Sequence, residues 1–185
     1  MEVVLVRHGE TEWSRDGRHT GSTDVPLTER GEEQARAVGE ALRGRSFALV
    51  LSSPLQRALE TARLAGFSPE TRDDLREWDY GEYEGRRTAE IRKEVPDWTI
   101  WSYGAPGGES AEQVAARADR VVAELRAVDG DGLVFAHGHL LRVLTARWLE
   151  LPPGEGRLFA LDSGTLSTLG YEREQSVIRS WNVSV

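Results

Sequence analysis

The sequence contains no cysteine among its 185 residues. Without a thiol, the chain can have no disulfide framework, no thiolate metal site and no cysteine nucleophile. It also has no long apolar run, since the N-terminal run covers only Val3 to Val6, between Glu2 and Arg7. Four residues are too few for a signal sequence, and no later stretch approaches the length of a membrane span. We therefore expect a cytoplasmic protein that does not bind membranes.

Positive charge is scarce as well, and almost all of it comes from arginine. The formal net charge is -8, and Lys93 is the only lysine. A surface this acidic repels nucleic acids and anionic lipids, so we expect neither as a partner. The balance of 39% hydrophobic and 29% charged residues is typical of a globular protein. This length fits a single domain over 1–185, and the sequence leaves both a monomer and a homodimer open.

Apolar runs alternate with helical periodicity along the chain. Short apolar runs predict three buried strands, at 3–6, 47–51 and 133–136. Apolar residues at helical spacing predict helices over 28–43, 54–66, 110–128 and 138–149. Two alternating runs in the tail, 157–171 and 176–183, predict a closing pair of strands that adds an antiparallel edge. This order predicts an α/β protein with three layers, α/β/α, around a mostly parallel central sheet.

Capping residues predict where two of the helices begin. Ser53 is expected to be an N-cap, with Pro54 at the first helical position. Ser110 and Gln113 have the spacing of a capping box. The stretch 67–108 between these two helices is rich in Gly, Trp, Tyr and acidic residues, and we expect it to be largely irregular.

Polar side chains follow each of the three predicted strands. Arg7 and His8 come directly after the first strand, and Arg57 lies one turn into the helix after the second. His137 and His139 follow the third. In open α/β sheets the ligand site lies beyond the carboxyl ends of the strands, where helix N-termini also favour an anion. Because arginine binds anions with a forked set of donors and histidine can attack or transfer protons near neutrality, the sequence predicts a phosphate pocket.

The segments that carry these residues resemble the histidine phosphatase superfamily, which includes the cofactor-dependent phosphoglycerate mutases. The resemblance begins at LVRHGETEW, and it continues in the same order along nearly the whole chain. The further segments are GRHTGSTDVPLTERG at 17–31, SSPLQRALETA at 52–62, LREWDYGEYEG at 75–85 and FAHGHLLRVL at 135–144. An early RHG, an SPLQR and a late HG together are highly specific, and they imply a phosphoglycerate mutase-like fold.

The resemblance also implies roles for the strand-end residues. His8 would be the nucleophile that accepts the phosphoryl group, while Arg7, Arg57 and His137 would hold the phosphoryl oxygens. The family's general acid is a glutamate in a segment that matches LREWDYG, which makes Glu77 the candidate. The nearby acidic residues Glu82 and Glu84 remain alternatives at this stage.

We expect no metal and no cofactor at this site. His137 and His139 alternate along the chain and could share a metal ion on one face. However, no Asp or Glu follows with a supporting spacing, and the two arginines at the site would repel a cation.

Further positions match residues that line the phosphate or substrate in relatives. The candidate substrate-binding residues are Thr11, Ser14, Thr20, Gly21, Tyr80, Gly138, His139 and Arg142. Ser14 departs from the asparagine common in the family, which puts that contact in doubt. Arg142 matches an arginine that binds the distal phosphate in the sedoheptulose-bisphosphatase type.

The resemblance favours a phosphatase over a mutase. Mutases carry arginine directly after the acid and a lysine further along, where this chain has Trp78 and Thr88. Several segments are similar to those of short bacterial acid phosphatases and of the sedoheptulose-bisphosphatase type. We therefore predict a metal-independent phosphomonoester hydrolase that acts on small phosphorylated metabolites, such as sugar phosphates, through a phosphohistidine on His8. A cofactor-dependent phosphoglycerate mutase is the alternative.

Overall fold

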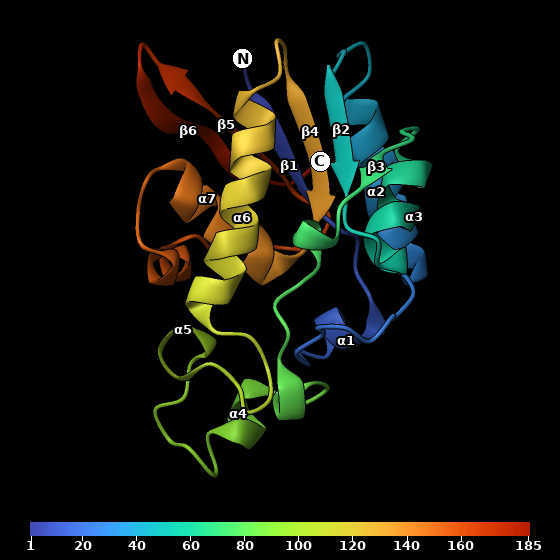
Figure 1. The fold of residues 1–185 in the computed structure, drawn as a ribbon. Coiled ribbons are helices and arrows are strands. Elements are labelled where there is room, and N and C mark those ends of the chain that lie inside the picture. The colour runs from blue at the N-terminus through green and yellow to red at the C-terminus, as the bar shows by residue number, and fades with distance from the viewer.

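The computed structural model describes residues 1–185 and is built around one six-stranded sheet (Figure 1). Its strands are β1 (Val3–Arg7), β2 (Leu49–Ser52), β3 (Glu70–Thr71), β4 (Gly132–Ala136), β5 (Leu166–Glu172) and β6 (Gln175–Val183). They lie in the order β3-β2-β4-β1-β5-β6. The pairs β1–β4, β2–β4 and β2–β3 are parallel, whereas β1–β5 and β5–β6 are antiparallel. The prediction of a mostly parallel sheet with an antiparallel edge is confirmed.

Long helices cover both faces of this sheet. The α-helices are α1 (Glu12–Arg15), α2 (Glu29–Ala41), α3 (Gln56–Leu64), α4 (Thr88–Ile91), α5 (Ile100–Tyr103), α6 (Ala111–Arg126) and α7 (Gly138–Trp148). Short 3-10 helices span Asp73–Leu75, Gly81–Tyr83 and Pro153–Leu158. No helix is long and apolar enough to cross a membrane.

Alternation of side chains along β1 explains the three layers. Val3 and Leu5 point to one face and pack in a core with residues of α6 and α7. Val4 and Val6 point to the other face and pack with residues of α2 and α3. Successive residues of a strand face opposite sides of the sheet, so a strand that is apolar throughout must be covered on both sides. The expected α/β/α layering is therefore confirmed.

Two local predictions were wrong. Ser53 does not cap α3, because this helix begins at Gln56 with Leu55 as its extended N-cap. The Ser53 hydroxyl instead accepts the Leu55 N–H at 3.3 Å. The first tail strand begins at Leu166 rather than near 157, because the stretch before it includes a 3-10 helix and a turn. By contrast, the capping box of Ser110 and Gln113 is present at the start of α6.

The turn after β1 lies against the start of α2, where two glycines make close backbone contacts. A Cβ atom on Gly9 would come within 2.2 Å of the Gly31 carbonyl oxygen. A Cβ atom on Gly31 would come within 2.1 Å of the Glu10 carbonyl oxygen. Neither distance is compatible with a side chain, so glycine at both positions lets the backbones touch. This contact fixes the path of the chain immediately after His8.

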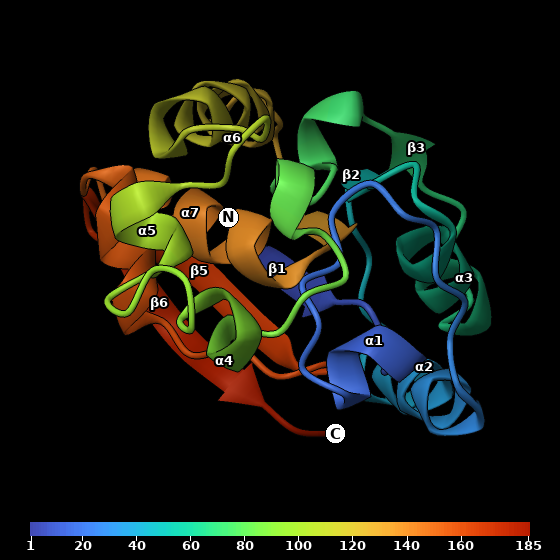
Figure 2. The same ribbon diagram turned by 90° about the horizontal axis from the view of Figure 1, so that it is seen from below.

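The parallel strands β1, β2 and β4 all end at the same side of the sheet, which Figure 2 views from below. The helix α1 and the segments around α4 and α5 lie at this side (Figures 1 and 2). The residues predicted at the three strand ends are thereby brought to one edge of the sheet.

Candidate active site

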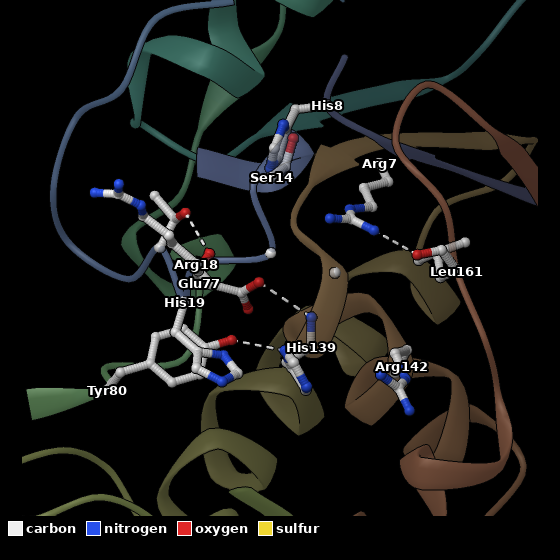
Figure 3. A pocket seen from close by; sticks show the side chains of 13 residues that line it. Arg7, His8, Ser14, Arg18, His19, Glu77, Tyr80, His139, Arg142 and Leu161 are labelled. Atoms are coloured by element: carbon white, nitrogen blue, oxygen red, sulfur yellow. Dashed lines mark hydrogen bonds between the residues drawn. The ribbon is translucent and has the colours of Figure 1, made fainter. Parts of the chain in front are cut away.

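A pocket lies at the carboxyl ends of the parallel strands (Figure 3). Its lining is strongly polar, with Leu161 and Tyr80 among the few residues that carry apolar surface. The residues lining it are Arg7, His8, Ser14, Gly17, Arg18, His19, Thr20, Glu77, Tyr80, Gly138, His139, Arg142 and Leu161. Three arginines and one carboxylate make this a cationic pocket in a chain whose net charge is -8.

His8 lies at the inner end of this pocket and is only 4% exposed. Its Nδ1 lies 2.7 Å from the carbonyl oxygen of Gly9. Burial, together with the nearby charges of Arg57 and Arg7, holds the pKa of His8 well below its ordinary value of 6.5. The ring is therefore neutral near pH 7, and since a carbonyl can only accept, Nδ1 carries the proton. The lone pair of His8 is consequently on Nε2, as a nucleophile requires.

A residue of α3 holds Gly9, the residue whose carbonyl orients His8. The Gly9 N–H donates to the Thr61 hydroxyl at 3.0 Å, and this hydroxyl donates to the Arg57 carbonyl at 2.7 Å. The Gly9 carbonyl is thus fixed where it meets the His8 ring. The ring centroid of His8 lies 5.2 Å from that of His137, so the two predicted histidines are neighbours.

Arg7 provides the cation beside His8. Its Nη1 donates to the carbonyl oxygen of Leu161, while its buried Nε has no protein partner. Burial lowers the pKa of Arg7, although Glu77 acts in the opposite direction. Gly138 allows this placement, because a Cβ there would lie only 3.3 Å from the Arg7 guanidinium carbon. Arg7 therefore presents an unused N–H donor in a buried part of the site.

The carboxylate of Glu77 is held at the N-terminus of α7. Its Oε1 accepts the N–H groups of Trp78 at 2.8 Å and Leu140 at 2.9 Å. Its Oε2 accepts only the His139 N–H, at 3.1 Å. The free N–H groups of a helix N-terminus favour a carboxylate in this position. Because Oε2 has a single partner, it is the oxygen with room to carry a proton.

The two alternative acids lie outside the pocket. Glu84 accepts hydrogen bonds from Ser22 and Thr23, and Glu82 is exposed. Burial alone raises the pKa of Glu84, but the bonds from Thr23 and Ser22 more than offset this and lower it. Glu84 therefore anchors the 22–23 loop as an ionised group. Of the three candidates, only Glu77 lines the pocket with His8.

Arg57 lies behind the pocket rather than in its lining. Its Nη2 donates to the carbonyls of Thr20 and Gly21, and its Nη1 donates to the carbonyl of Thr23 at 2.9 Å. The side chain is fully buried, and its Nε donates to Nδ1 of His137 at 3.1 Å. In this structure, then, Arg57 holds a loop and a histidine, and most of its donors are already used.

The hydrogen bond from Arg57 determines the tautomer of His137. Arginine can only donate, so Nδ1 of His137 is an acceptor and its proton is on Nε2. That proton is directed to the Ser53 hydroxyl, 2.7 Å away. Burial, with the charge of Arg57 second, holds the pKa of His137 well below 6.5. His137 is thus a neutral, fully buried residue next to His8, and it does not line the pocket.

Aromatic residues form the outer wall. The Tyr80 hydroxyl lies 2.6 Å from Nδ1 of His139, and the His139 ring packs 5.1 Å from that of Trp101. The guanidinium carbon of Arg142 lies over the Trp101 ring, 4.7 Å from the ring centroid. Its Nε and Nη2 donate to the carbonyls of Gly156 and Arg157, so Nη1 is the donor without a bond to the protein. Tyr80, His139 and Arg142 all line the pocket, as their predicted roles require.

The remaining predicted residues divide between the pocket and the loops around it. Ser14, Thr20 and Gly138 line the pocket. Thr11 does not, because it is fully buried and its hydroxyl accepts the Ser14 N–H as the cap of α1. Gly21 also lies outside, where its carbonyl accepts from Arg57.

Four lining residues were not predicted, namely Gly17, Arg18, His19 and Leu161. The first three precede Thr20 in the GRHTG segment, so their position next to predicted residues was the available signal. His19 bonds to the Thr88 hydroxyl at 3.1 Å, and burial lowers its pKa to about 4. Leu161 carried no signal, since it follows an irregular stretch of the tail.

These buried neutral histidines predict a loss of stability in mild acid. His8, His137 and His139 have a pKa held well below 6.5 chiefly by burial, and that of His19 is about 4. Below pH 6.5 the unfolded chain binds protons that the folded chain does not, so stability falls as the pH falls. The slope approaches about 1.4 kcal/mol per pH unit for each such histidine.

The measurement is the free energy of unfolding in urea between pH 8 and pH 4.5. Carboxylates whose pKa is lowered in the folded protein, such as Glu109 and Asp74, reduce the stability mainly near and below their ordinary pKa values of 4.5 and 3.8, so the fall between pH 6.5 and pH 5.5 reports the histidines. His19→Gln should have a shallower slope below pH 6.5 than the parent protein. A free energy of unfolding that is constant from pH 7 to pH 5 would contradict the prediction.

No group of three or more His, Asp or Glu side chains is arranged to hold a metal ion. Residues 3–184 match the family model for the histidine phosphatase superfamily (branch 1). The match begins at β1 and ends after β6, so it takes in every element that contributes to the pocket.

Two curated relatives and one solved structure are similar over most of their length. An acid phosphatase of Mycobacterium tuberculosis is 44% identical over 175 residues, which cover 92% of this chain and 86% of the relative. The sedoheptulose 1,7-bisphosphatase of Saccharomyces cerevisiae is 39% identical over 183 residues, covering 80% of this chain and 67% of the relative. The solved structure of an open reading frame product from Mycobacterium tuberculosis superposes with a TM-score of 0.96 and 40% identity, covering 99% and 97% of the two chains.

Proposed function

Because the chain belongs to the histidine phosphatase superfamily, we propose that it hydrolyses phosphate monoesters of small metabolites through a phosphohistidine on His8. The observation that carries this proposal is the His8–Gly9 hydrogen bond, which leaves the lone pair of the ring on Nε2. We further propose that residues 1–185 work as one domain, since the family match covers 3–184.

In the first step, Nε2 of His8 attacks phosphorus and the bond from phosphorus to the ester oxygen breaks. Glu77 enters this step protonated and gives its proton to the departing oxygen, which leaves as an alcohol. Nδ1 of His8 keeps its proton and its bond to Gly9 throughout. Arg7 lines the pocket, and its guanidinium stabilises the negative charge of the equatorial oxygens.

In the second step, water attacks the phosphorus of phosphohistidine and the P–N bond breaks. The Glu77 carboxylate takes a proton from that water and so returns to its starting state. Inorganic phosphate leaves, and the lone pair is again on Nε2 of His8. The low pKa of His8 keeps this nitrogen unprotonated below pH 6.5, in agreement with the acid phosphatase name of one relative.

The pocket supports a small, polar and highly anionic substrate. Beyond Arg7, two further arginines line it, and Arg142 has Nη1 free of protein bonds. A sugar phosphate fits this lining, because its hydroxyl groups suit Ser14 and Thr20 while its phosphate requires cations. The substrate in the name of one relative, sedoheptulose 1,7-bisphosphatase, belongs to the same class. We propose Arg142 as a contact for a second anionic group of such a substrate.

The mutase alternative is less favoured. At the position where mutases carry arginine after the acid, Trp78 is fully buried and its indole N–H donates to the Glu109 carbonyl. At the position of the mutase lysine, the Thr88 hydroxyl is bonded to His19. With these cations missing, a bisphosphorylated intermediate has fewer groups to hold it, so transfer to water is favoured.

Hydrolysis of a panel of phosphate esters in excess chelator tests the proposal. The panel contains sugar monophosphates, sugar bisphosphates, 3-phosphoglycerate and p-nitrophenyl phosphate, and released phosphate is measured. We expect activity that chelator leaves unchanged, with sugar phosphates among the substrates used. Loss of activity in chelator would refute the metal-independent mechanism. Conversion of 3-phosphoglycerate to 2-phosphoglycerate that depends on bisphosphoglycerate would favour the mutase.

A further inference from the structure

A partly buried ion pair lies next to the segment that carries Glu77, outside the pocket that contains His8. Arg117 of α6 donates from Nε to Oε1 of Glu109 at 2.7 Å and from Nη2 to Oε2 at 2.8 Å. The Arg117 residue is only 9% exposed. Burial alone raises the pKa of Glu109, but the hydrogen bonds from Arg117 and the Asp79 N–H outweigh this and lower it. The pair is therefore fully ionised and forked, the strongest geometry for arginine and carboxylate.

The remaining Arg117 donors hold the backbone that carries Glu77. Nη1 donates to the carbonyls of Asp74 and Arg76, each at 2.8 Å. Nη2 donates to the carbonyl of Glu77 itself, at 3.1 Å. One guanidinium thus binds three carbonyls along the end of the 3-10 helix Asp73–Leu75 and the irregular stretch that leads from it to Glu77.

Glu109 holds the residues that follow Glu77. Its Oε2 accepts the Asp79 N–H at 3.0 Å, and its carbonyl accepts the Trp78 indole N–H at 2.9 Å. Its own N–H donates to the Asp79 carbonyl at 3.0 Å. Together, Arg117 and Glu109 fix the chain on both sides of Glu77, and neither residue lines the pocket that contains His8.

We propose that Arg117, paired with Glu109, is the positioning residue that holds Glu77 where it can protonate the departing oxygen. This inference rests on the proposed function, because it assigns Arg117 a role through Glu77 and none of its own in the reaction. The carboxylate must reach the N–H groups of Trp78, His139 and Leu140 at once, so a small rotation of its peptide would break this arrangement. A misplacement of about 1 Å is enough to lower a rate substantially.

The test compares rates on esters whose leaving groups differ in their need for a proton. p-Nitrophenolate leaves without being protonated, whereas the alkoxide of an alkyl ester such as glycerol phosphate must receive a proton as it leaves. Arg117→Met is expected to lower kcat/KM, which reports only the first step, about tenfold further on the alkyl phosphate than on p-nitrophenyl phosphate. A general loss of structure would lower both rates by the same factor. Glu109→Gln, which keeps the side-chain size, serves as the second variant and should show a smaller shift in the same direction.

Arg120→Met is the matched control. Arg120 lies on the same helix and forms an exposed ion pair with Asp74, in the same segment, but through the aspartate side chain. It has no bond to the backbone around Glu77. We expect the ratio of the two rates to equal that of the parent protein.

The Glu77→Gln variant separates the two levels of the proposal. It should itself show the leaving-group effect, and adding Arg117→Met to it should change the ratio no further. If Glu77→Gln shows no leaving-group effect, the proposed acid is wrong and the role of Arg117 is overturned with it. If Glu77→Gln shows the leaving-group effect but Arg117→Met and Glu109→Gln do not, only the positioning role is overturned. The same holds if the ratio of the two rates in the double variant changes by the product of the changes in Glu77→Gln and Arg117→Met.

Discussion

His8→Ala is expected to lower kcat by about a thousandfold or more on every phosphate ester, including p-nitrophenyl phosphate. A good leaving group cannot compensate, because the attacking nitrogen itself is removed. The variant should also fail to retain labelled phosphate after rapid quenching in base, where phosphohistidine survives. Initial rates and the quenched label are the two measurements.

Glu77→Gln serves as the control for the label, since it keeps His8 and its bond to the Gly9 carbonyl. It should still incorporate labelled phosphate when p-nitrophenyl phosphate is the donor. Circular dichroism and thermal unfolding should show that His8→Ala remains folded. Label or substantial turnover in folded His8→Ala would contradict the assignment of the nucleophile.

Arg57→Met is expected to lower the free energy of unfolding by about 3 kcal/mol or more, as well as kcat. Its guanidinium donates to three loop carbonyls and to His137. Methionine has a similar length but no donor, so these acceptors would be left without partners. The loop that contains Thr20 would then be free to leave the pocket. Urea denaturation measures the stability, and the rate on p-nitrophenyl phosphate measures the effect on the site.

Arg63→Met provides the comparison on the same helix, α3. Arg63 pairs only with Glu60, and its side chain is 67% exposed. Exposed pairs contribute little, so the free energy of unfolding of this variant should stay close to that of the parent protein. Similar losses in the two variants would show that the loop carbonyls do not depend on Arg57.

The fold and the edge that carries the site follow from local patterns in the sequence. Apolar runs as short as Val3 to Val6 identify strands, and alternation of strands with helices requires a layered α/β arrangement. Because parallel strands end at one edge, Arg7 and His8 must come near the residues that follow β4. No knowledge of the loops is needed for this step.

The partners of individual donors could not be predicted in the same way. Arg57 binds carbonyls of a loop that precedes it by more than thirty residues, and the path of that loop has no periodicity. Thr11 and Ser14 bond to each other in a capping box that neither residue type signals uniquely. Arg117 looks like any arginine on an amphipathic helix until the irregular segment beneath it is known. Loop geometry, which decides these contacts, depends on tertiary packing rather than on local propensity.

The strand order has a consequence for how the protein folds. β4 lies between β1 and β2 in the sheet, so the first two strands cannot join it until most of the chain has been synthesised. Val3 cannot pair with Gly132, its partner in β4, until that distant part of the sequence has been synthesised. Contacts between such distant residues form slowly, and until then β1 has an unpaired apolar edge that invites aggregation. Shortened chains that end before β4 should therefore be insoluble as well as inactive, and the nucleophile is among the last parts of the site to become ordered.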